Sequence, residues 1–122
     1  MEIEKFYEAI GGNYEDALSR LMNDELVSKF VLKFKEQDYL PELEEAISSG
    51  DLEKVFFAVH TLKGVALNLS FEKLGEACVE LTEYLRGDKK ENAVMAEVVS
   101  SFKKISVEYK KVIENIALFI EN

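Results

Sequence analysis

Residues 52–69 read LEKVFFAVHTLKGVALNL, and apolar side chains recur in this stretch at steps of three and four residues. The recurring positions are Leu52, Val55, Val59, Leu62, Ala66 and Leu69. An α-helix turns once in about 3.6 residues, so these side chains share one side of a helix. Asp51 precedes them as a candidate N-cap. We therefore expect one long helix here, with a continuous apolar stripe that faces a core.

The same spacing extends in both directions from this stretch. After Ser70 one run ends at Gly87-Asp88, and a longer run starts at about Glu91. The two runs carry the apolar residues Leu74, Cys78, Leu81 and Leu85, and then Val98, Phe102, Ile105, Tyr109, Val112, Ile116 and Phe119. A shorter, broken stripe lies over residues 38–48. No segment keeps a period of two, so strands are not expected.

Three further short helices are expected before residue 38. They are Ile3–Ile10, Tyr14–Met22 and a segment that begins after a cap at Asn23 or Asp24. Short connections make neighbouring helices antiparallel. The sequence therefore predicts a single all-α domain over residues 1–122, built as an up-down antiparallel four-helix bundle. Short extra N-terminal helices, before about residue 23, are expected to cap one end or pack on its outside.

The composition excludes several classes of function. The chain has 15 Lys plus Arg against 24 Asp plus Glu, a net charge of -9, which argues against binding nucleic acid through its phosphates. The single cysteine and the single histidine cannot form an internal disulfide or a zinc cluster. No signal peptide and no apolar run of about 18 residues is present, so no membrane span is expected. We expect a soluble, cytoplasmic domain without a cofactor.

The only histidine lies away from the apolar stripe. At 100° per residue, His60 is about 130° from the centre of the stripe, which predicts a solvent-facing side chain. Between it and the edge of the core are Phe56, Lys63 and Leu67, and nearly opposite the core are Phe57 and Gly64. The histidine is therefore a candidate for chemistry with a partner and not for a role in the core.

Two neighbours of this histidine fit a phosphorylated imidazole. Side chains on a helix lean toward its N-terminus, so residue 64 would overhang His60, and glycine there leaves the ring uncovered. Gly64 costs about 1 kcal/mol relative to alanine in a helix interior. Lys63 is one turn from His60 and places an ammonium group beside it. Neutral imidazole is a nucleophile at pH 7, and phosphoryl transfer depends on neutralising the transferred charge.

The residues around the histidine resemble a known family signature. The stretch 58–69, AVHTLKGVALNL, closely resembles that of histidine-containing phosphotransfer (Hpt) domains, A-H-x-L-K-G followed by four variable residues, a hydrophobic residue and Gly. Residues 43–51 and 74–85 are similar to the helices that flank the signature in that family. The resemblance is strong from about Phe30 to Gly87.

The chain departs from the family pattern at two positions. Val59 stands where alanine is common, and Ser70 stands where glycine is usual. Two roles are open for Ser70. Its backbone adopts a left-handed conformation, at a cost of about 1 kcal/mol for a residue other than glycine, or its side chain caps the helix that starts at Phe71.

The resemblance implies a four-helix bundle that carries one phosphoryl group between the aspartates of two receiver domains. By position, His60 is implied as the phosphoacceptor, Lys63 as its charge partner and Gly64 as the residue that leaves the imidazole uncovered. The implied partners are the receiver domains of a hybrid sensor histidine kinase and of a response regulator, which supply the aspartate and the Mg²⁺. The chain has no glycine-rich phosphate-binding loop, so we expect a phosphocarrier that neither binds ATP nor phosphorylates itself. A starting Met and a complete bundle favour a free-standing carrier.

The docking surface for such a partner is expected to be apolar at its centre and polar at its rim. Its candidates are Phe56, Phe57, Leu67 and Asn68. For Phe57 a second possibility stays open, in which the N-terminal helices cover its ring.

One alternative function is a helical adaptor that binds a partner without chemistry. An adaptor would keep the bundle and the acidic surface, but it would have no use for Gly64 beside an exposed His60. A catalytic Cys–His pair is disfavoured, because Cys78 belongs to an apolar stripe and is expected to point into the core.

Overall fold

The computed structural model describes residues 1–121, which form seven α-helices, one 3-10 helix and no strand. In chain order these are α1 (Ile3–Ile10), α2 (Tyr14–Leu21), α3 (Asp24–Phe34), α4 (Tyr39–Ser49), α5 (Leu52–Asn68), α6 (Glu72–Tyr84), η1 (Gly87–Asn92) and α7 (Met95–Glu121). The all-α fold class is confirmed. Within this range no helix is both long and apolar enough to cross a membrane.

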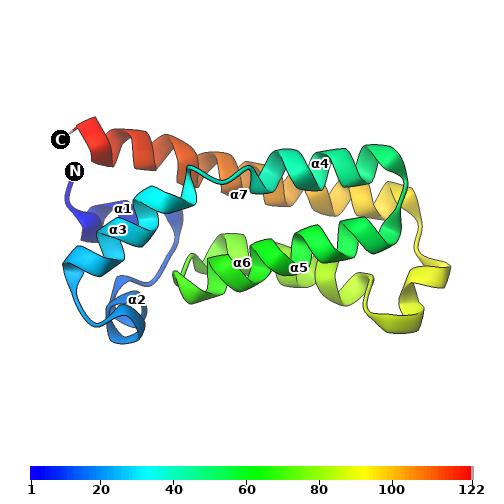
Figure 1. The fold of residues 1–122 in the computed structure, drawn as a ribbon, viewed down its shortest axis with the longest axis horizontal. Helices are drawn as coiled ribbons and strands as arrows, with labels where there is room; N and C mark the ends of the chain where they lie inside the picture. The colour runs from blue at the N-terminus through cyan, green and yellow to red at the C-terminus, as the bar shows by residue number, and fades with distance from the viewer. Residues whose placement is uncertain (122) are drawn as a thin grey trace.

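Helices α4 to α7 form the four-helix bundle. In Figure 1, α4 and α7 lie along one side of the bundle, and α5 and α6 lie along the other. Helix α5 packs against α4 and α6, and α7 closes the bundle against α6 and α4. Because consecutive helices run in opposite directions, the α5–α6 turn lies at the end of the bundle where the N-terminal helices gather.

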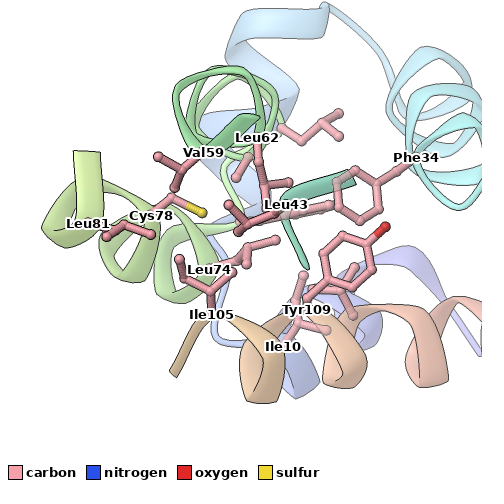
Figure 2. Packing of buried hydrophobic residues seen from close by; sticks show 14 of the residues in the cluster. Ile10, Phe34, Leu43, Val59, Leu62, Leu74, Cys78, Leu81, Ile105 and Tyr109 are labelled. Atoms are coloured by element: carbon pink, nitrogen blue, oxygen red, sulfur yellow. The ribbon is translucent and has the colours of Figure 1, made fainter. Parts of the chain in front are cut away.

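The stripe of α5 faces the centre of this bundle. Val55, Val59, Leu62 and Ala66 have no exposed surface, as their spacing predicts. Figure 2 shows side chains from the four helices converging on one another. Those labelled there include Leu43, Val59, Leu62, Leu74, Cys78, Leu81 and Ile105, all of which are fully or almost fully buried. The buried stripe therefore fixes α5 in the bundle, and the face of α5 opposite to this stripe points outward.

Local capping explains where the site-bearing helix begins. The carboxylate of Asp51 accepts hydrogen bonds from the backbone N–H groups of Glu53 and Lys54, at 3.1 and 3.3 Å. Gly50, just before it, has a φ of 74°, a left-handed conformation that ends α4 and that glycine adopts without steric cost. A two-residue connection thus turns the chain from α4 into α5.

The start of the last helix differs from the prediction. The sequence predicts a helix from about Glu91, whereas α7 begins at Met95 and residues 87–92 form η1. Segment 87–92 reads GDKKEN and has no apolar side chain to bury. Contacts with other elements hold the chain there instead, and the backbone N–H of Val94 donates a 2.8 Å hydrogen bond to the hydroxyl oxygen of Tyr84.

The N-terminal helices α1, α2 and α3 gather at one end of the bundle, as expected for the segments before residue 23 (Figure 1). Helix α1 packs on the C-terminal part of α7, where the ring centroids of Phe6 and Phe119 are 6.1 Å apart. The hydroxyl of Tyr7 donates a buried 2.7 Å hydrogen bond to the carbonyl oxygen of Leu69. The short helices are therefore fastened to the last turn of α5.

Ser70 adopts the left-handed conformation, with a φ of 58°. The chain reverses there, and the N–H of Phe71 bonds to the carbonyl of Ala66 at 2.9 Å, which closes the C-terminus of α5. The hydroxyl of Ser70 donates a 2.6 Å hydrogen bond to Asp16 Oδ2 of α2. Helix α6 has Phe71 at its N-cap and no side-chain cap bond, so the capping role for Ser70 is wrong.

Candidate functional site

The side chain of His60 is exposed on the outer face of α5, as its angle from the apolar stripe predicts. Its imidazole lies beside the ring of Phe56, one turn earlier, with ring centroids 5.7 Å apart and planes tilted by 31°. Phe56 is half-buried and packs against the core. The imidazole therefore has an aromatic wall on one side and solvent on the other.

Two cations, one from the turn after α6 and one from η1, lie near this aromatic wall. The guanidinium carbon of Arg86 is 6.0 Å from the ring centroid of Phe56, and the ammonium of Lys90 is 5.1 Å from it. Lys90 also forms a 2.7 Å ion pair with Glu53, in the first turn of α5. Both cations attract the face of an aromatic ring, so they help to hold Phe56 in place. Sequence reasoning missed Arg86 and Lys90.

Gly64 has open space around it. Apart from its chain neighbours and the backbone of its own helix, a Cβ atom added at this position would meet no atom within 4 Å. Packing inside the molecule therefore gives no reason for a glycine in the middle of α5, where it lowers helix stability. What the glycine provides is a bare stretch of backbone one turn from His60, where a partner chain can approach closely.

Lys63 is half-buried and lies one turn beyond His60 on α5. No carboxylate in the part of the chain that the structure describes forms an ion pair with it. Its ammonium group is therefore available to an anionic group near the imidazole. Phe56, His60, Lys63 and Gly64 thus all lie within residues 56–64 of α5.

The expected docking residues differ in how exposed their side chains are. Phe57 is 75% exposed, so the N-terminal helices do not cover its ring. Leu67 is 38% exposed and rests partly on α6, because a Cβ at Gly75 would lie only 2.6 Å from Leu67 Cδ2. Asn68 is exposed and lines a surface hollow beside α2 and α3. Phe57, Leu67 and Asn68 are thus exposed, Phe57 more than Leu67, whereas Phe56 is half-buried.

Cys78 is separate from this site. Its side chain is fully buried and points into the bundle core (Figure 2). Burial raises the pKa of the thiol to about 12, so it stays protonated at neutral pH. The site around His60 therefore has no cysteine thiolate. Among the described residues, no group of His, Cys, Asp and Glu side chains could hold a metal ion.

Comparison with models of protein families matches residues 31–117 to the Hpt domain. The matched range includes all of α4, α5, α6 and η1 and most of α7, and it leaves out α1, α2 and most of α3. Searches of curated proteins and of solved structures found no match. Because the matched range is more than half of the chain, this chain belongs to the Hpt domain family, whose members carry phosphoryl groups on histidine between receiver domains in phosphorelays.

Proposed function

We propose that this chain is the phosphocarrier of a multistep phosphorelay, and that His60 carries the phosphoryl group. The observation that carries the proposal is the setting of this side chain. His60 is exposed on a helix whose other face is locked in the core, with open space over Gly64 one turn away. It is also the only histidine in the sequence.

The chemistry needs one imidazole nitrogen that carries no hydrogen. That nitrogen of His60 attacks the phosphorus of a receiver's aspartyl phosphate, so a P–N bond forms. The P–O bond to the aspartate breaks, and its electron pair leaves with the carboxylate. Transfer to the second receiver reverses these changes, since its aspartate oxygen attacks the phosphorus and the electron pair of the P–N bond returns to the imidazole.

The neighbouring residues assist without forming bonds to phosphorus. The ammonium of Lys63 neutralises charge on the phosphoryl oxygens, which is the main requirement in this kind of transfer. Phe56 limits the movement of the imidazole, with which its ring is in contact at 5.7 Å between centroids. Gly64 lets the backbone of the receiver come close. The receiver contributes the aspartate and the Mg²⁺, so the carrier needs no cofactor, does not bind ATP and does not phosphorylate itself.

The partners in this proposal are receiver domains of a hybrid sensor histidine kinase and of a response regulator in the cytoplasm. They dock over the surface that surrounds His60. Phe57, Leu67 and Asn68 offer exposed apolar and polar groups there, and Phe56 contributes the edge of its ring.

The test is a transfer profile with isolated receiver domains from the same organism, each phosphorylated with ³²P. We expect at least one of them to label the chain, with a phosphate that is labile in acid and stable in base. The His60→Gln variant is the matched control and should remain unlabelled. Binding of a receiver without labelling would favour an adaptor, and label that survives His60→Gln would place the chemistry elsewhere.

A further inference from the structure

A surface groove lies along the flank of α5 that faces α3 and α4. It consists of two hollows with Tyr39 in the wall of both. The first, of about 450 Å³, lies between α4 and the N-terminal half of α5. The second, of about 480 Å³, lies between α2, α3 and the C-terminal half of α5. We call them the α4 hollow and the α3 hollow.

The two hollows carry opposite charge. The α4 hollow is lined by Glu42, Glu45 and Glu53, with Lys54 as its one cation. Glu53 is paired with Lys90, so Glu42 and Glu45 against Lys54 leave the hollow with one net negative charge. The pKa of Tyr39, on the border, is raised first by burial and then by the charge of Glu42.

The α3 hollow has two cations, Arg20 and Lys33, and no carboxylate in its lining. Arg20 is paired with Asp16 at 2.9 Å, so Lys33 supplies the free positive charge. Its ammonium lies 5.8 Å from the ring centroid of Phe30. The groove is therefore negative toward one end of α5 and positive toward the other.

Each hollow also exposes an aromatic ring. Phe57 in the α4 hollow is 75% exposed, and Phe30 in the α3 hollow is 39% exposed. Aromatic groups ringed by polar ones are common at the centre of protein interfaces. A complementary occupant is an amphipathic segment with an apolar stripe, basic residues at one end and an acidic residue at the other.

The groove lies next to the proposed phosphoryl site. At 100° per residue, Phe57 and Asn68 point about 60° and 80° to the same side of His60. Gly64 is on the same side, at about 40° from His60. Phe57 and Asn68 therefore form the edge of the groove nearest His60, and a segment in the groove lies on the flank of α5 next to the imidazole, which itself lines neither hollow.

We propose that this groove orients the receiver partner by its charge polarity. An amphipathic segment of the receiver lies along it, with its basic end over Glu42 and Glu45 and its acidic end beside Lys33. This direction sets the receiver's aspartate over His60, and the reverse direction places like charges together at both ends. The inference rests on the proposed phosphotransfer function and adds how the partner is selected and aligned.

Part of the wall of the α3 hollow lies outside the family match. Arg20, Leu21 and Phe30 line it and precede residue 31, where the matched range begins. The N-terminal addition of this chain therefore completes the wall of the α3 hollow, whose free cation Lys33 belongs to the matched Hpt segment. A surface of that kind discriminates between receivers that share the same phosphoryl chemistry.

The test uses Glu45→Lys and Lys33→Glu, singly and together, at two exposed helix positions. The probe is the phosphorylated receiver domain that labels the wild-type chain. We expect each reversal to raise the receiver concentration needed for half-maximal transfer by roughly fivefold at low salt, and the double variant to show both effects. Labelling of His60 by the small donor phosphoramidate, which does not use the groove, should change little.

Matched controls are Lys103→Glu and Glu114→Lys, which make the same charge changes at exposed positions of α7. An equal effect in the controls would mean that only net charge matters and would overturn the inference. A wild-type chain that is labelled, with groove variants that behave like it, would overturn the inference and leave the function intact. Absence of label on the wild-type chain from every receiver would overturn both.

Discussion

Gly64 shows at the scale of one residue how function and stability oppose each other. The residue sits inside α5, and no neighbouring atom would obstruct a side chain there. Glycine has more freedom to lose on folding than alanine, so the helix is weaker for having it. A residue that costs stability and improves no internal contact is best explained by what approaches from outside.

The Gly64→Ala variant is therefore expected to be more stable than the wild-type chain, by roughly 0.5 to 1 kcal/mol. Transfer from a phosphorylated receiver should become slower by roughly tenfold, because the added methyl group displaces the partner from its reacting position. Urea unfolding measures the first effect and single-turnover transfer the second. A loss of stability would show that the glycine has an internal role after all.

Ser70 combines a strained backbone with a side-chain contact, and two substitutions separate them. Ser70→Ala and Ser70→Gly both remove the hydrogen bond to Asp16, but only glycine relieves the left-handed conformation at φ 58°. The glycine variant is expected to be more stable than the alanine variant by roughly 1 kcal/mol. Thermal unfolding of the pair provides the comparison, and equal stabilities would show that the backbone carries no strain.

At the scale of the element, the two faces of α5 have different roles. One face buries Val55, Val59, Leu62 and Ala66 completely, and the opposite face presents His60 to solvent. Because the buried face packs against α4 and α6, the direction of the imidazole is set before any partner arrives. Pre-organisation of this kind lowers the cost of aligning the reacting groups.

Substitutions on the two faces should therefore have separable effects. Leu62→Ala is expected to reduce the free energy of unfolding by roughly 2 to 5 kcal/mol, because it leaves a cavity in the core. His60→Gln should change it by less than about 0.5 kcal/mol and abolish phosphoryl labelling. Denaturant unfolding and ³²P labelling of both variants check this. A large loss of stability in His60→Gln would contradict the assignment of this face to chemistry.

How far each element could be predicted depends on how local its determinants are. The bounds of α5 and the exposure of His60 follow from a periodicity within one stretch. The start of α7 does not, since Tyr84 and Val94 meet across the η1 segment. The cations beside Phe56 and the two hollows of the groove also come from elements far apart in the chain. No spacing rule within one helix reveals such contacts.

At the scale of the whole molecule, the N-terminal helices form an addition that is tied to the end of the site-bearing helix. Tyr7, Asn13 and Asp16 each bond to the turn at residues 69 and 70. The last of these bonds involves a carboxylate, so the attachment depends on pH. The pKa of Asp16 is lowered, first by the hydrogen bond from Ser70 and then by Arg20.

A carboxyl group whose pKa is lower in the folded state adds stability above its ordinary pKa of 3.8, and this stability disappears as the pH falls through the lower folded value. The wild-type chain is therefore expected to lose more stability between pH 6 and pH 3 than the Asp16→Asn variant. Urea unfolding of both proteins at the two pH values measures the difference. Identical losses would show that Asp16 does not couple α2 to the bundle.

The buried position of Cys78 makes the molecule well suited to optical study. Its thiol is sealed in the core and remains protonated, so maleimide reagents will not reach it in the folded chain. A cysteine introduced at the exposed Thr61, adjacent to His60, would be the one reactive thiol. A single fluorophore there would report the arrival and departure of a receiver in real time, without a cysteine-free background.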